Sequence, residues 1–112
     1  DRFTALAGSS PAFILTLVEA LARGGVDAGM PKAQAVDVVA QALLGTAVLV
    51  RREAEGRAED GAARTPADLV DAVCSPGGTT IAGLVAMERE GFSPAVVEAV
   101  RATIARDRAL GA

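Results

Sequence analysis

The segment from Ser75 to Thr80 reads Ser-Pro-Gly-Gly-Thr-Thr, and an apolar stretch from Ile81 to Met87 follows it at once. The proline makes the entry to this segment rigid, and the two glycines free the backbone before the apolar stretch, which we expect to be helical. The first N–H groups of a helix have no partner inside it and lie at the positive end of its dipole. The segment therefore predicts a cradle for a small anion, a carboxylate or a phosphate, with a threonine hydroxyl beside it.

This local pattern leaves alternatives open. A tight turn before an ordinary capped helix would use the same residue types. A nucleotide-binding P-loop does not fit, because no lysine follows Gly77 and Gly78. The choice between an anion site and a simple turn therefore depends on the remainder of the chain.

The chain of 112 residues is long enough for one small domain, and it is strongly apolar. Hydrophobic residues make up 51% of it and aromatic residues 3%, with a mean hydropathy of +0.36. No uninterrupted apolar run reaches the roughly 18 residues of a membrane-spanning helix, because Thr16 and Glu19 interrupt the run from Ala12 to Ala22. We therefore expect the excess apolar surface to meet another protein chain and not a membrane.

Charge and residue usage exclude several classes of function. The net charge is −3 and the arginines are scattered, which argues against nucleic-acid binding. The chain has no histidine, so histidine-based catalytic triads and metal sites are excluded, and we expect no metal. Cys74 is the single cysteine and fits a reducing compartment, which predicts a cytoplasmic protein.

Apolar periodicity and capping residues predict an all-α fold of about five helices, without strand-like alternation. Glycines mark the expected ends, with Gly29-Met30-Pro31 closing the first helix and Gly91 the fourth. The charged segment from Arg51 to Arg64 is expected to be a fraying helix end and then a loop with a solvated face. The five helices are expected to begin at Ser9-Ser10-Pro11, at Pro31, at Thr65-Pro66, at about Thr79 and at Ser93-Pro94.

The expected first helix is apolar on nearly all sides, and such a helix is normally buried. A domain of 112 residues can hardly bury it alone, so a second chain is expected to cover it. Glu19, within this helix, is interpreted either as a site carboxylate or as a residue satisfied by a partner. The chain begins at Asp1 without a methionine, and we interpret residues 1–112 as one helical domain of a longer protein.

The order of these motifs resembles the C-terminal domain of pyrroline-5-carboxylate reductase, from roughly Leu6 to Leu110. Ser-Pro-Gly-Gly-Thr-Thr-Ile is highly specific in this setting, and the other motifs support it. In chain order they are Gly-Ser-x-Pro-Ala-Phe at 8–13, Gly-x-Pro at 29–31, Ala-Gln-Ala-Leu-Leu-Gly at 40–45, Pro-x-x-Leu-x-x-x-Val-x-Ser-Pro-Gly-Gly-Thr-Thr-Ile at 66–81, and Gly-Phe at 91–92 before a helix with Glu-Ala-Val.

The resemblance implies a reductase that makes L-proline from 1-pyrroline-5-carboxylate by hydride transfer from NADPH or NADH. In that family an N-terminal Rossmann domain, absent from this chain, binds most of the cofactor. The helical domain interlocks with its twin to form a homodimer, and the family also forms rings of dimers. The fragment alone is therefore expected to be inactive.

The resemblance also implies roles for particular residues. The substrate carboxylate would be held by Ser75, Gly77, Gly78, Thr79 and Thr80, through backbone N–H groups. Thr80 matches the position whose hydroxyl faces the ring nitrogen, where it donates or relays a proton.

A second set, Ser9, Ser10 and Pro11, matches a segment near the nicotinamide end of the cofactor. The sequence departs from the family in two places. Ser10 stands where the family usually has glycine, and the segment from Arg51 to Arg64 looks several residues longer than the usual link.

Two other functions compete with the reductase. A non-catalytic helical oligomerisation module would also need an apolar first helix, and a dinucleotide-binding motif before Asp1 would discriminate against it. The helical domain of a hydroxy-acid dehydrogenase would need a helical lysine near the substrate. The only lysine, Lys32, stands at a helix start, which disfavours that option.

Overall fold

The computed structural model describes residues 2–56 and 63–111, which form helices joined by short turns and loops and contain no strand. The all-α prediction is therefore confirmed. In chain order the elements are α1 (Arg2–Thr4), the π-helical segment η1 (Ala5–Ser9), α2 (Ser10–Asp27), α3 (Lys32–Ala54), α4 (Pro66–Val73), α5 (Thr79–Arg89) and α6 (Phe92–Gly111).

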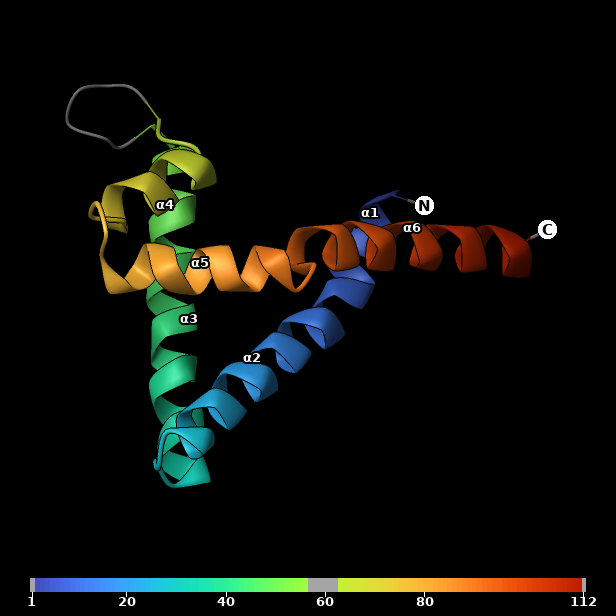
Figure 1. The fold of residues 1–112 in the computed structure, drawn as a ribbon. Helices are drawn as coiled ribbons and strands as arrows, with labels where there is room; N and C mark the ends of the chain where they lie inside the picture. Colours follow the sequence, from blue (N-terminus) through green and yellow to red (C-terminus); the bar gives the residue numbers. More distant parts are fainter. Residues whose placement is uncertain (1, 57–62, 112) are drawn as a thin grey trace.

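The long helices form an open triangle (Figure 1). The α2 and α3 helices diverge from a tight connection at their lower end, where Gly29 and Met30 donate backbone hydrogen bonds back to Val26 and Gly25. The α5 and α6 helices run nearly in line along the third side, and α6 passes beside η1. The arrangement leaves the faces of these helices largely uncovered.

Helix α2 begins at Ser10 with Pro11 in its first turn, as the sequence predicted, but the expected cap is missing and the chain before it is already helical. The chain is continuously helical from Arg2 to Asp27, and Ser9 has helical angles and makes no side-chain cap. The hydroxyl of Ser10 donates instead to the Leu6 carbonyl, as a serine within a helix does. The widened π-helical turn just before Pro11 relieves the clash of its ring with the preceding turn, so α2 begins at Ser10 with Pro11 in its first turn although the chain before it is already helical.

The α2 and α3 helices approach each other through small side chains. Ala22 and Ala35 are buried, and a Cβ atom added to Gly25 would lie 3.1 Å from the Cβ atom of Ala35. Glu19 of α2 accepts hydrogen bonds from Arg23 at 2.8 Å and from Lys32 of α3 at 2.9 Å. The hydrogen bond from Lys32 is the main cause of the lowered pKa of Glu19.

The Glu19 contacts answer the question that the sequence left open. Glu19 is satisfied by cations of its own chain, and Lys32 is engaged in the same contact. Neither residue is therefore left as an unpaired charge for a substrate.

The described part of the chain has almost no core of its own. Its buried hydrophobic residues are Ala5, Ala22 and Ala35, whereas Leu15 and Leu44 are 68% and 60% exposed. A hollow of about 680 Å³ lies between α2 and the α5–α6 arm and is lined mostly by apolar side chains. Exposed apolar surface on this scale marks an interaction face.

Two helices correct the expectation about membrane-spanning length. The helix Arg2–Asp27 and helix α3 each contain an 18-residue window, of mean hydropathy 1.5 and 1.7, and are long and apolar enough to cross a membrane. The expectation rested on uninterrupted apolar runs, whereas a hydropathy average tolerates an isolated polar residue. Length and composition alone give the two helices this property, and the core helix of a soluble protein can share it.

Candidate substrate-binding turn

The turn at Ser75 is closed by its own backbone. The N–H of Gly78 donates to the Ser75 carbonyl at 3.0 Å, with Pro76 and Gly77 as the two central residues. Gly77 has φ +68°, so the turn has the proline and glycine placement of type II. A tight turn is therefore present. Its importance for function depends on the groups that it exposes to a ligand.

Gly78 has a different requirement from Gly77. Its φ of −80° is open to any residue, but a Cβ atom there would overlap the Ser75 hydroxyl oxygen and lie 3.2 Å from the Ser75 carbonyl oxygen. The sequence alone indicated one role for both glycines, that of freeing the backbone. Each glycine also has a conformational or steric reason within the turn itself.

The turn delivers the open N-terminus of α5. Gly78 is the N-cap residue and offers no capping side chain, and the first bond across this end runs from the Ala82 N–H to the Gly78 carbonyl at 3.4 Å. The N–H groups of Thr79, Thr80 and Ile81 consequently have no acceptor within the helix. Ser75, Thr79 and Thr80 are not buried, so the predicted anion-binding residues lie together at the surface.

The predicted nicotinamide residues lie elsewhere. Ser9 ends η1, and Ser10 and Pro11 begin α2, beside α6 and not beside the turn. The eleven residues of α5 separate the two regions, a length of about 16 Å at 1.5 Å per residue. A single chain does not bring Ser10 and Thr80 together, so a site that used both would take them from two chains.

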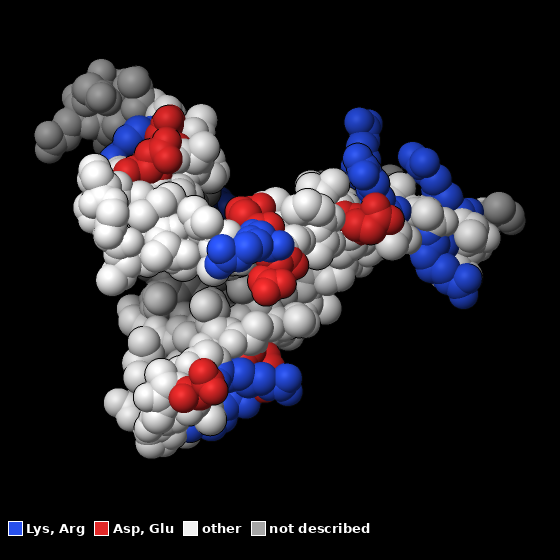
Figure 2. Space-filling model, viewed as in Figure 1, with Lys and Arg blue, Asp and Glu red and all other residues white. Residues whose placement is uncertain are grey.

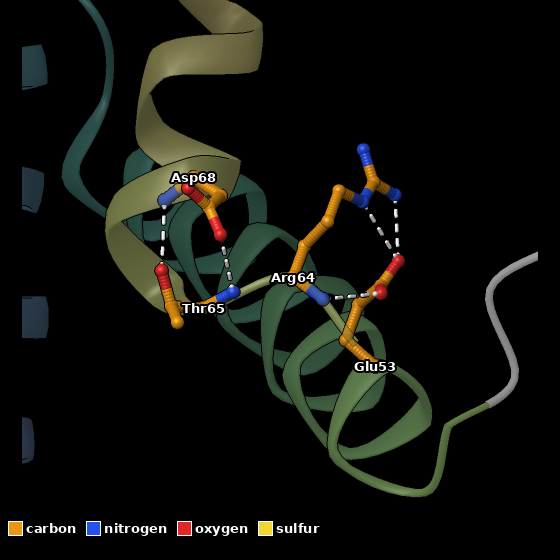
Figure 3. A network of polar contacts seen from close by, with 4 residues as sticks. All are labelled: Glu53, Arg64, Thr65 and Asp68. Atoms are coloured by element: carbon orange, nitrogen blue, oxygen red, sulfur yellow. Dashed lines mark hydrogen bonds and ion pairs between the residues drawn. The ribbon is translucent and has the colours of Figure 1, made fainter. Parts of the chain in front are cut away.

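A network of polar contacts that the sequence prediction missed stands at the start of α4 (Figure 3). Glu53, at the end of α3, is buried, with 5% of its surface exposed, and it accepts hydrogen bonds from Arg64. This corrects the expectation of a solvated face between Arg51 and Arg64; residues 57–62 of that segment lie outside the described residues. The side-chain hydrogen bond from Arg64 lowers the pKa of Glu53.

The next residues form a capping box at the helix start that the sequence predicted at Thr65-Pro66. The Asp68 N–H donates to the Thr65 hydroxyl at 3.2 Å, and the Thr65 N–H donates to the Asp68 carboxylate at 2.9 Å. The hydrogen bond from the Thr65 backbone is the main cause of the lowered pKa of Asp68. The sequence offered one indication that Glu53 has a partner, because Arg64 directly precedes the strong helix start at Thr65.

Charged side chains elsewhere stand in separate clusters with uncharged surface between them, as Figure 2 shows for one face. Among the residues that the structure describes, no group of three or more acids or cysteines could hold a metal ion. The turn can therefore act on an anion through backbone N–H groups and hydroxyls.

Fold and site together define a class, a helical dimerisation domain whose apolar faces need a second chain and whose α5 N-terminus is open to an anion. The chain matches the family described as pyrroline-5-carboxylate reductase dimerisation over residues 1–110. It belongs to that family.

Individual relatives agree with this assignment. The pyrroline-5-carboxylate reductase of Synechocystis is 45% identical over 111 residues, which are 99% of this chain and 38% of that protein. The enzyme of Escherichia coli K12 is 43% identical over 95 residues, which are 85% of this chain and 32% of that protein. The chain thus spans less than two fifths of these relatives.

Solved structures show the same helical arrangement. The crystal structure of 1-pyrroline-5-carboxylate reductase from Streptococcus pyogenes superposes with a TM-score of 0.84 and 46% identity, over 95% of this chain and 38% of that chain. The Plasmodium falciparum pyrroline carboxylate reductase, solved with NADP bound, gives a TM-score of 0.87 at 28% identity, over all of this chain and 39% of that chain.

Proposed function

We propose that this chain supplies the dimer interface and the substrate-carboxylate site of a reductase that converts 1-pyrroline-5-carboxylate to L-proline with NADPH or NADH. The observation that carries the proposal is the open N-terminus of α5 behind the Ser75 turn, on a chain of this family. Three backbone N–H groups converge there without a buried arginine, and a helix N-terminus binds a carboxylate by this means.

The reaction needs a group at the ring nitrogen as well as a carboxylate anchor. NADPH or NADH, when bound, supplies the hydride. Thr80 would place its hydroxyl at the nitrogen, where it donates a hydrogen bond or relays a proton. Because a hydroxyl is a weak acid, we assign most of the effect to positioning, which lowers barriers by about 7–11 kcal/mol in favourable cases.

The residues Ser9, Ser10 and Pro11 are proposed to lie at the nicotinamide end of the cofactor. The Ser10 hydroxyl already donates to Leu6, so toward a cofactor it can act only as an acceptor. The carboxamide group of nicotinamide carries N–H donors, which fit that acceptor. Assays of the longer protein with NADPH and with NADH would establish its preference.

The test of the proposal is Thr80→Val in the full-length reductase that contains this domain. Valine keeps the shape of threonine and removes the hydroxyl, so we expect kcat/KM to fall about tenfold to a hundredfold for 1-pyrroline-5-carboxylate. Thr103→Val is the matched control, because the Thr103 hydroxyl donates at 2.8 Å to the Ala99 carbonyl of its own helix. Wild-type kinetics for Thr80→Val would remove Thr80 from the mechanism.

A non-catalytic oligomerisation module is the second candidate, and the near absence of a core within the described part of one chain favours it. Both functions predict a homodimer, so the oligomeric state does not separate them. The distinguishing measurement is NADPH or NADH oxidation by the full-length protein with 1-pyrroline-5-carboxylate. Activity at the level of a no-enzyme blank would favour the module.

Assembly and location complete the proposal. We expect homodimers that associate further into a ring, and sedimentation velocity of the full-length protein would find dimers alone if the ring is wrong. We also propose a cytoplasmic location, supported by the single cysteine, Cys74. Cell fractionation would test the location.

A further inference from the structure

We propose that Glu53 and Arg64 form a clasp that positions the substrate-binding turn, which makes Glu53 a positioning residue for the reaction. This inference rests on the proposed function of the turn as the carboxylate site. The observations behind it are the geometry of the clasp, its burial, and the short path of chain from Arg64 to Ser75.

The clasp uses both oxygens of one carboxylate. Glu53 Oε2 accepts from the Arg64 backbone N–H at 3.0 Å, while Glu53 Oε1 accepts from the Arg64 guanidinium at 3.0 Å and 2.6 Å. Figure 3 shows that these bonds reach from the end of α3 to the residue just before the Thr65 cap of α4. Because the backbone of Arg64 is held as well as its side chain, the clasp fixes where α4 begins.

Burial makes the clasp hard to replace by water. The Glu53 side chain is 7% exposed, whereas that of Arg64 is 48% exposed. A carboxylate in that position costs free energy unless charged or polar hydrogen-bond donors satisfy it, and every hydrogen bond named above comes from Arg64. Loss of Arg64 therefore leaves Glu53 without its compensating cation.

The path from the clasp to the turn is short and has few other supports. Thr65 caps α4, whose eight residues span about 12 Å at 1.5 Å per residue. Cys74 ends the helix, and Ser75 starts the turn. Because α4 contributes no buried residue, packing within the chain does little to hold it. A shift of its first turn is therefore passed on to Ser75 and Gly78.

The experiment uses the full-length enzyme with Glu53→Gln, Arg64→Met and the double variant. Glu98→Gln is the matched control, because Glu98 faces Arg101 at 3.9 Å in an exposed ion pair. The first readout is amide hydrogen exchange of residues 66–82, which does not depend on catalysis. The second is the separate change of KM and kcat for 1-pyrroline-5-carboxylate, and sedimentation velocity verifies that each variant keeps the assembly of the wild type.

We expect Glu53→Gln to speed exchange in residues 66–82 about tenfold while exchange in α2 stays unchanged. We expect KM to rise about tenfold with kcat within about twofold, since the turn binds the substrate and does not perform the chemistry. The double variant is expected to resemble the single variants, because the two residues act as one unit. The Glu98→Gln control is expected to match the wild type in every readout.

Failure of this inference differs from failure of the proposed function. Unchanged exchange in Glu53→Gln, or effects of the two substitutions that simply add, would overturn the clasp. Faster exchange with an unchanged KM would also overturn the proposal, because the clasp would then stabilise the structure without positioning the turn for the substrate. Unchanged kinetics in Thr80→Val, with the exchange effect of Glu53→Gln intact, would instead count against the proposed role of Thr80 and leave the clasp standing. If Glu53→Gln fails to assemble, Arg64→Met provides the same readouts, because it leaves the backbone bond to Glu53 in place.

Discussion

Gly77 and Gly78 are neighbours with unlike roles. Gly77 adopts φ +68°, which costs a residue with a Cβ atom about 1–2 kcal/mol. Gly78 has ordinary backbone angles, but its hydrogen atom faces Ser75, where a Cβ atom has no room. Glycine is thus required at position 77 by the positive φ angle, and at position 78 by the proximity of Ser75.

Gly77→Ala tests this distinction. We expect it to lower the free energy of unfolding by about 1–2 kcal/mol and to raise KM, because the turn no longer holds the N–H groups of α5 in place. Gly83→Ala is the control, since Gly83 lies within α5 where a Cβ atom would meet open space, and alanine there should stabilise the helix by about 0.5–1 kcal/mol. Urea unfolding and steady-state kinetics measure both variants. Equal effects of the two substitutions would contradict the role given to φ at Gly77.

Helix α4 is short, and polar contacts at its first residues define where it starts. Thr65 and Asp68 satisfy each other's backbone N–H groups, and the Glu53–Arg64 clasp holds the residue before them. A helix of eight residues is marginal in water without such support. Helix α4 connects the end of α3 to the turn at Ser75.

Thr65→Ala removes the cap of α4. We expect a loss of about 1 kcal/mol of stability, the usual effect of deleting a threonine N-cap, with faster amide exchange in residues 66–73. Thr16→Ala is a control of opposite sign, because Thr16 lies within α2 and alanine is the better helix former there. Thermal unfolding and hydrogen exchange measure both variants. Equal behaviour of Thr65→Ala and Thr16→Ala would contradict the role of Thr65 as a cap.

The assembled protein depends on surface that one chain leaves open. The α2 and α3 helices pack on each other through alanine and glycine, which brings their backbones close but buries little apolar area. Within the described part of the chain, no atom of another helix would lie within 4 Å of a Cβ atom at Gly45, so α3 is open at that position. A second copy is the natural cover for these faces in a family of dimerisation domains.

Leu44→Glu probes that cover. Leu44 of α3 is 60% exposed in one chain, and burying a leucine contributes about 1.5–3 kcal/mol. We expect the dissociation constant of the dimer to rise at least about tenfold and Tm to depend more strongly on protein concentration. Glu90→Lys, which changes a charge at an exposed charged position, is the control in sedimentation velocity. A dimer as tight as the wild type would place Leu44 outside the interface.

Local chemistry made several features predictable. The helix starts at Thr65 and Thr79, the break at Gly29 and the tight turn at Ser75 each follow from bonds within a few residues, so the sequence alone determined them. The proposed anion-binding residues from Ser75 to Thr80 are also contiguous in the chain, so their proximity follows from the sequence. The hydroxyl cap expected at the Ser9-Ser10-Pro11 start was wrong, because a π-helical segment runs directly into α2 and Ser9 makes no side-chain cap.

Other features depend on residues that are distant in the chain, and only the tertiary structure decided them. Glu53 pairs with Arg64, eleven positions away, and the pairing of Glu19 with Lys32 arises from the packing of α2 on α3. The separation of Ser10 from Thr80 arises from the direction of α5 and α6. The physical reason is that turns and caps are closed by neighbouring backbone groups, whereas burial and ion pairing are set by which elements meet in space.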